Sequence, residues 1–235
     1  MSEAHFTVDG TLIDAWASLK SFQPKTGAKS PTDGDTGNPS VDFHGERRSN
    51  ATHESTTDAE ARLLRKSKGK EAKLGFGLHA LMENRHGLCV QAEVTSATGV
   101  TETTAATELL ARQLDQAERP PQSVGADKGY HNAEMVSFCR EQGIAPHVAL
   151  IKGRAVTGLD GRTTRTLGYQ TSQKVRKRIE EIFGWGKEIG GLRRTRKRGV
   201  DRVGLSAILI LSSYNLVRMA KLLGSPPRPP TLATA

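Results

Sequence analysis

A short stretch in the middle of the chain, residues 123–132, places an acid where a buried strand would end. It reads S-V-G-A-D-K-G-Y-H-N: small and apolar residues lead to Asp127, a glycine follows two residues later, and Asn132 is placed to cap a helix. Ligands of open α/β sheets bind at the carboxyl ends of strands, so an acid held there can bind a metal or act as a base. A polar strand-to-helix turn without chemistry is the alternative, and this stretch alone leaves both open.

Positive charge is concentrated late in the chain. The 235 residues carry 34 Lys and Arg against 25 Asp and Glu, which gives a net charge of +9. Eleven cations and four acids lie between Lys174 and Arg202, so this segment supplies +7 of the +9. A solvated helix face is the ordinary explanation of a charge run, whereas a basic segment of this kind also suits a polyanionic partner.

The order of the remaining segments predicts a mixed α/β sheet with helices on its faces. Residues 5–18 are either a first strand that presents Asp9 or a hairpin turning at Asp9-Gly10. The segments expected after it are a flexible polar insertion at 21–54, a helical turn starting at 55, a hairpin of 73–83 with 88–95, a helix at 101–118, the strand ending at Asp127, a helix at 133–142, a strand at 145–151, a polar loop at 152–171, a helix at 172–189 and an apolar helix at 203–223. We expect one domain over residues 1–223 and a disordered, proline-rich tail at 224–235.

The predicted helix at 172–189 combines an acid with a row of cations. At about 100° per residue, Arg176, Glu180 and Lys187 line up along one flank. The loop that follows, residues 190–199, reads G-G-L-R-R-T-R-K-R-G and is almost wholly basic. An acid fixed among cations in this way is unusual for a purely structural helix face.

The apolar closing segment is too short to span a bilayer as an uninterrupted run. Leu205–Leu211 is soon followed by polar and charged residues, including Asn215 and Arg218. We therefore expect a buried helix, no membrane contact and a cytoplasmic, nucleoid-associated protein.

Four segments together resemble the DDE transposases of bacterial insertion sequences, in the family usually numbered five. They are V-D-G-T-L-I-D-A-W-A-S-x-K-S-F, T-T-D-A-E-A-R-L, A-D-K-G-Y-H-N and R-K-R-I-E-E-I-F-G-W-G-K, and the resemblance extends from His5 to Leu223. It implies a ribonuclease H-like catalytic domain in which two aspartates and a glutamate bind two divalent cations, Mg²⁺ or Mn²⁺. Matched residue by residue, these catalytic and metal-binding acids are Asp9, Asp127 and Glu180.

The resemblance also implies a DNA-binding surface. The family's Tyr, Arg, Glu, Lys signature matches Arg176, Glu180 and Lys187, but its tyrosine position is Gln173 here. The cations expected to contact DNA backbone phosphates are Arg176, Lys187, Arg193, Arg194, Arg196, Lys197 and Arg198. The expected partner is double-stranded DNA, both transposon ends and target, bound by a homodimer.

The implied activity is metal-dependent cleavage of transposon ends followed by strand transfer into target DNA. Hard carboxylate oxygens suit Mg²⁺, and two such ions can assist in-line displacement at phosphorus. Relatives carry a helical end-binding region before the first catalytic strand, whereas Asp9 comes almost at once here. We therefore expect the catalytic portion of a truncated, split or frameshifted element. The alternatives are an inactive fragment that only binds DNA or interferes with transposition, and a general nuclease of the same fold.

Overall fold

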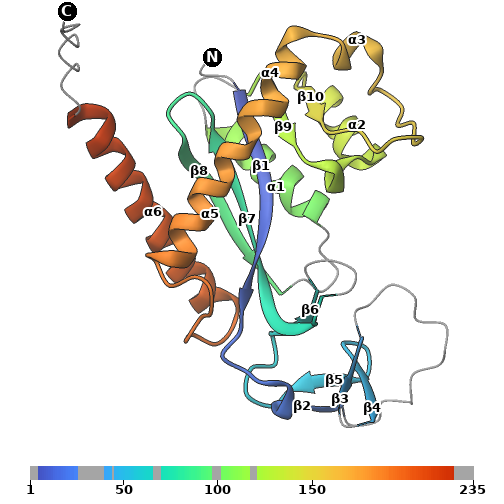
Figure 1. Ribbon diagram of the computed structural model, residues 1–235, viewed down its shortest axis with the longest axis vertical. Helices are drawn as coiled ribbons and strands as arrows, with labels where there is room; N and C mark the ends of the chain where they lie inside the picture. The colour runs from blue at the N-terminus through green and yellow to red at the C-terminus, as the bar shows by residue number, and fades with distance from the viewer. Residues whose placement is uncertain are drawn as a thin grey trace, which may run out of the picture.

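The computed structural model describes residues 5–25, 40–43, 45–65, 70–96, 102–116 and 121–224, and it centres on a mixed sheet (Figure 1). The strands run in the order β10–β9–β1–β7, and β6 and β8 both pair with the outer side of β7. They are β1 (His5–Asp14), β6 (Arg62–Leu64), β7 (Lys73–Glu83), β8 (Leu88–Thr95), β9 (Ser123–Ala126) and β10 (Ala145–Val148).

The strand directions identify the fold. β7 is antiparallel to β1, β6 and β8, whereas β9 is parallel to both β1 and β10. An antiparallel meander of β1, β7 and β8, continued by parallel strands on the other side of β1, is the sheet of a ribonuclease H-like domain. The predicted fold class is confirmed, and residues 5–14 form the strand that presents Asp9 rather than a hairpin.

Helices cover both faces of this sheet. α1 (Glu102–Gln116) and α2 (Ala133–Glu141) pack on one face, over Phe6, Val8 and Leu81. α5 (Ile179–Glu188) and α6 (Val200–Gly224) pack on the other. Because successive side chains of a strand point to opposite faces, the even-numbered residues of β7 join the second core while Leu81 joins the first.

Side-chain caps explain where two helices begin. Asn132 accepts a hydrogen bond from the backbone N–H of Met135 at 3.0 Å, as its position before α2 predicted. Thr166 accepts one from Tyr169 N–H at 3.1 Å, so α4 (Leu167–Val175) begins within the segment predicted as a polar loop. That segment also contains α3 (Gly161–Thr164). The helix predicted at 172–189 is thus α4, a 3₁₀ turn η3 (Arg176–Arg178) and α5 in succession.

The insertion predicted to be flexible at 21–54 differs from that expectation in its described part. A 3₁₀ turn, η1 (Leu19–Ser21), leads into β2 (Phe22–Pro24), which pairs with β5 (His53–Ser55), and β3 (Ser40–Phe43) pairs with β4 (Glu46–Ser49). This small unit lies at the lower end of the molecule in Figure 1. Residues 26–39 and 44 lie outside the described part of the chain. After β5, Ser55 Oγ accepts from Asp58 N–H at 3.1 Å and a turn follows, but no helix forms and the chain continues as β6.

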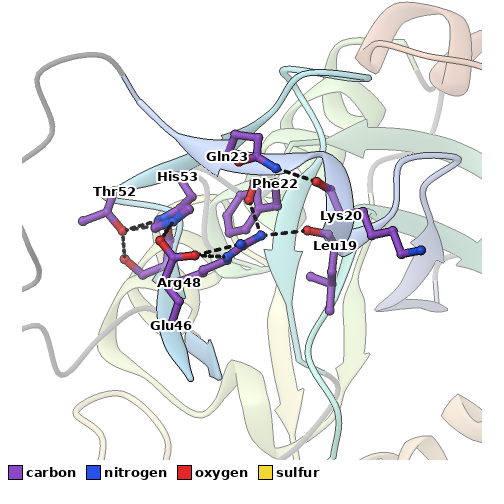
Figure 2. A network of polar contacts seen from close by, with 9 residues as sticks. Leu19, Lys20, Phe22, Gln23, Glu46, Arg48, Thr52 and His53 are labelled. Atoms are coloured by element: carbon purple, nitrogen blue, oxygen red, sulfur yellow. Dashed lines mark hydrogen bonds and ion pairs between the residues drawn. The ribbon is translucent and has the colours of Figure 1, made fainter. Parts of the chain in front are cut away.

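A buried arginine holds the small β unit together (Figure 2). Arg48 donates to the carbonyl oxygens of Leu19 and Phe22 at 3.1 and 2.7 Å, and to the Glu46 carboxylate at 2.8 Å. His53 contacts the same carboxylate at 3.2 Å. Hydrogen bonding by Arg48 lowers the pKa of Glu46. The contacts of this ion pair join the segment of Leu19 and Phe22, strand β4 and His53 of β5.

The closing helix α6 is long and apolar enough to cross a membrane by length and composition alone. One side of α6 is tied to the domain, but the expected buried helix is only partly buried, because large apolar side chains such as Leu209, Leu216 and Leu223 are exposed. Asn215 accepts from Cys89 N–H at 2.9 Å and donates to Cys89 C=O at 2.7 Å, and the Tyr214 hydroxyl donates to Gly87 C=O at 3.2 Å. The predicted tail, apart from Gly224 at the end of α6, lies outside the described residues.

Candidate active site

Two of the predicted acids come together where β9 ends beside β1. The parallel pairing of these strands places Thr7 opposite Gly125. Two residues further along each chain, Asp9 and Asp127 are therefore level with one another. β9 ends at Ala126 while β1 continues to Asp14, so the pair lies in the crevice at the carboxyl end of a strand.

Backbone N–H groups hold both carboxylates. Asp9 Oδ1 accepts from Gly10 N–H at 2.8 Å, and Asp127 Oδ1 accepts from Gly129 N–H at 2.6 Å as the cap of the 3₁₀ turn η2 (Lys128–Tyr130). Burial raises the pKa of Asp9 from 3.8 to about 6. The Gly10 hydrogen bond opposes this rise, and the negative charge of Asp127 adds to it. The two carboxylates are therefore close enough to repel one another.

Sequence reasoning missed a third acid at this place. Glu102, the first residue of α1, also raises the pKa of Asp9, and its own pKa is raised by burial and by Asp127. A methyl group placed on Gly129 would lie 3.0 Å from Asp127 Oδ1 and 3.3 Å from Glu102 Oε2. The sequence offered only that Glu102 is an acid at the start of the helix predicted at 101–118.

Glu180 occupies a different position. It is exposed on α5, between two cations of the same helical stripe that both reach the sheet. Lys187 Nζ donates to Thr11 Oγ1 in β1 at 2.6 Å, and Arg176 lowers the pKa of Asp9. Across the described ranges no three His, Cys, Asp or Glu side chains are packed as a ready cation site, and this holds for the aspartate pair taken with Glu180 as well as with any other acid.

Gln173, where the transposase signature has tyrosine, positions Arg176. Its Nε2 donates to His147 C=O at 2.5 Å, and its Oε1 accepts from Arg176 Nε at 3.0 Å. η3 also packs closely on β9, because a methyl group on Gly125 would lie 3.2 Å from Arg176 Cβ. The departure from the signature therefore leaves Arg176 anchored next to the aspartates.

The five cations of the basic loop are all exposed, and two of them are also anchored by contacts within the protein. Arg194 donates to the carbonyl oxygens of Ala15 and Trp16 at 3.3 and 3.2 Å, and its guanidinium lies 5.5 Å from the Trp16 ring centroid. Arg193 forms an ion pair with Glu188. The remaining three predicted DNA contacts are exposed on the loop: Arg196, Lys197 and Arg198.

A comparison with models of protein families identifies the family of this chain. The family model described as the transposase DDE domain matches residues 41–216, well over half of the sequence. The chain belongs to the transposase DDE domain family. The match starts after β1, so Asp127 and Glu180 of this transposase domain lie inside it and Asp9 lies before it.

Other comparisons of the transposase domain gave more distant results. A search of curated proteins gave no match. Among solved structures, the catalytic core domain of BIV integrase aligns with a TM-score of 0.31 and 11% identity over 59% of this chain and 74% of that one. The piggyBac transposase synaptic complex with hairpin DNA aligns with a TM-score of 0.37 and 9% identity over 98% of this chain and 55% of that one.

The donor chemistry of the aspartate pair fits a divalent cation. Asp9 and Asp127 offer hard carboxylate oxygens from two neighbouring strands, which are the ligands that Mg²⁺ and Mn²⁺ prefer. Burial is the main reason that the pKa of Asp9 is raised, repulsion by Asp127 adds to it, and a bound cation offsets both.

Without a cation, the burial of the Asp9 charge, together with repulsion from Asp127, should make the transposase domain less stable at neutral pH. Asp9 holds its proton more tightly in the folded than in the unfolded chain, so the free energy of unfolding falls as pH rises from about 4 to about 6 and stays low above that. In EDTA we expect Asp9→Asn to raise the free energy of unfolding by about 2–3 kcal/mol at pH 7.5 and to change it little at pH 4. Urea unfolding at both pH values measures this.

Asp14→Asn is the control for that measurement. Asp14 ends the same strand with a 39% exposed side chain and pairs with Lys73 at 3.8 Å, so it should give no pH-dependent gain. An Asp9→Asn gain that is equal at pH 4 and pH 7.5 would contradict the raised pKa.

Proposed function

We propose that this chain is a DNA transposase that cleaves transposon ends and joins them to target DNA by metal-dependent phosphoryl transfer. The observation that carries the proposal is the Asp9–Asp127 pair at the carboxyl ends of adjacent parallel strands, in a chain that belongs to the transposase DDE domain family. A rigid carboxylate pair at this crevice suits cation binding.

The chain's own residues have distinct roles in this proposal. Asp9 and Asp127 would hold divalent cations, which when bound activate the attacking oxygen and stabilise the leaving oxygen at phosphorus. Arg176, anchored by Gln173, would neutralise a phosphate beside the pair. Lys187, whose Nζ donates to Thr11 Oγ1, would neutralise a second phosphate further along β1. Glu180, on the stripe between these two cations, would complete the carboxylate set when DNA and cations are bound.

DNA is the proposed partner because cations extend from the acid pair along one surface. The path runs from η3 and α5 to the exposed end of the basic loop. Phosphate contacts of this kind position a duplex without reading its sequence. Two transposon ends brought together need two active sites, which favours a homodimer. Because the proposed substrate is DNA, we place the protein on the nucleoid in the cytoplasm.

A DNA-binding fragment without activity is the second candidate. It keeps the basic surface but needs no functional acid pair, and the arrangement of Asp9 and Asp127 does not favour it. The two candidates differ in one result, Mg²⁺-dependent strand cleavage.

Glu180→Gln tests the third proposed carboxylate. We expect Mg²⁺-dependent nicking of DNA to fall by about a hundredfold or more, roughly 3 kcal/mol of transition-state stabilisation, with DNA affinity unchanged. Glu181→Gln is the matched control. Glu181 is exposed at the next position of α5 and lies about 100° around the helix from the stripe of Arg176, Glu180 and Lys187. Nicking rates that stay equal in both variants would remove Glu180 from the site.

A further inference from the structure

The strongest unassigned feature of the molecule is the position of Glu102. This glutamate starts α1 on the face of the sheet opposite α5, yet its Oε2 lies within 3.3 Å of a methyl position at Gly129 that is 3.0 Å from Asp127 Oδ1. Its side chain is accessible to solvent. α1 therefore brings an acid to the aspartate pair from the side that α5 does not reach.

A cavity adjoins Glu102 along β1. Its volume is about 150 Å³, and its lining includes Thr11, Arg65, His79, Thr95 and Glu102 but neither of the two aspartates. Thr11 is the residue that Lys187 contacts, so the cavity lies between Glu102 and the proposed phosphate contact. A water occupies about 30 Å³ in the liquid, so the cavity has room for several, as a hydrated cation needs.

A buried hydroxyl beside these acids lacks a partner. Tyr130 is fully buried, and within the described residues its hydroxyl makes no hydrogen bond. Burial raises its pKa most, and Glu102, Asp9 and Asp127 each raise it further, which places the hydroxyl near all three carboxylates. Buried polar groups are nearly always hydrogen-bonded, so this hydroxyl indicates a ligand or ordered water at the site.

We propose that Glu102 is a further carboxylate ligand for the divalent cations of this site, next to Asp127. The inference rests on the proposed function, because it takes the aspartate pair to be a cation site. Three carboxylates on β1, on the turn after β9 and on α1 repel one another until a cation neutralises them. The competing explanation is structural: an acid in the first turn of a helix is also stabilised by the helix dipole.

Mn²⁺ binding without DNA separates these explanations. Isothermal titration of Mn²⁺ into the wild-type chain and the Glu102→Gln, Glu108→Gln and Asp127→Asn variants gives the affinities. We expect Glu102→Gln to weaken Mn²⁺ binding about tenfold or more, and Asp127→Asn to weaken it at least as much. Glu108→Gln should bind like wild type, because Glu108 is exposed elsewhere on the same helix. Wild-type affinity in Glu102→Gln with weakened binding in Asp127→Asn would overturn the assignment of Glu102 alone.

Failure of the proposed function gives a different pattern. If the wild-type chain binds no Mn²⁺, or if Asp127→Asn leaves its affinity unchanged, the aspartate pair is not a cation site and both proposals fall.

Thermal unfolding in EDTA and in Mn²⁺ supplies a second readout. If Glu102 is a cation ligand, the Mn²⁺-induced rise in Tm should be smaller in Glu102→Gln and partly restored in Glu102→Asp. A helix-dipole role alone predicts that Glu102→Gln lowers Tm equally in both buffers, which would contradict the proposal.

Discussion

Asp127→Asn should abolish Mg²⁺-dependent DNA strand cleavage, lowering the rate by more than about a thousandfold, or roughly 4 kcal/mol of transition-state stabilisation. The substitution removes the charge that a cation needs from a residue placed beside Asp9. The amide oxygen of Asn can still accept the 2.6 Å hydrogen bond from Gly129 N–H, so the turn after β9 should keep its structure. Single-turnover cleavage of labelled duplex measures the rate.

Two controls test whether the loss of cleavage is specific to Asp127 and separate from DNA binding. Asp115→Asn removes the same charge from an exposed position on α1 and should cleave like wild type. DNA affinity of Asp127→Asn should match or slightly exceed that of wild type, because the cationic surface is intact and one negative charge is gone. Cleavage that persists in Asp127→Asn would show that the activity belongs to another site or another protein.

Removing the exposed cations of the basic loop should weaken DNA binding about a hundredfold at 0.1 M salt, since each lost phosphate contact lowers the salt-dependence slope by about 0.9. The variant replaces Arg196, Lys197 and Arg198 with Ala. Arg194 is left in place because it supports the Ala15 and Trp16 carbonyl oxygens. Titration of duplex DNA over a salt series measures both the affinity and the slope.

The matched control for the loop variant removes three exposed cations elsewhere, Lys152, Arg154 and Arg165. An equal loss in this control would mean that net charge, rather than the loop, governs binding. Wild-type affinities for transposon ends and for random duplex should agree within about tenfold, roughly 1.4 kcal/mol, because phosphate contacts carry no base information. A preference for the ends of a thousandfold would place sequence reading within this chain.

The elements predicted well from the sequence are those with local signals. The hairpin of β7 and β8, the acid after β9 and the Asn132 cap are each set by residues close in sequence. Asp127 stood out because it follows a short buried strand, whereas Asp9 was assigned only through the resemblance to transposases, and the pairing of β1 with β9 brings the two together.

The features missed depend on tertiary contacts. The small β unit is stabilised by the hydrogen bonds of one buried arginine, Arg48, and no hydrophobic period marks it. The early start of α4 depends on the Thr166 cap within a polar segment. Glu102 reaches the aspartates only because α1 packs with its first turn at the crevice, which no spacing in the sequence reveals.

The most direct measurement is anomalous diffraction from crystals of the chain grown with Mn²⁺. We expect a peak within about 2.0–2.3 Å of carboxylate oxygens of both Asp9 and Asp127, the range for hard cations with oxygen ligands. Mn²⁺ found only at other surface acids, with Asp9 and Asp127 unliganded at saturating concentration, would contradict the assignment of this pair as the metal site of the transposase.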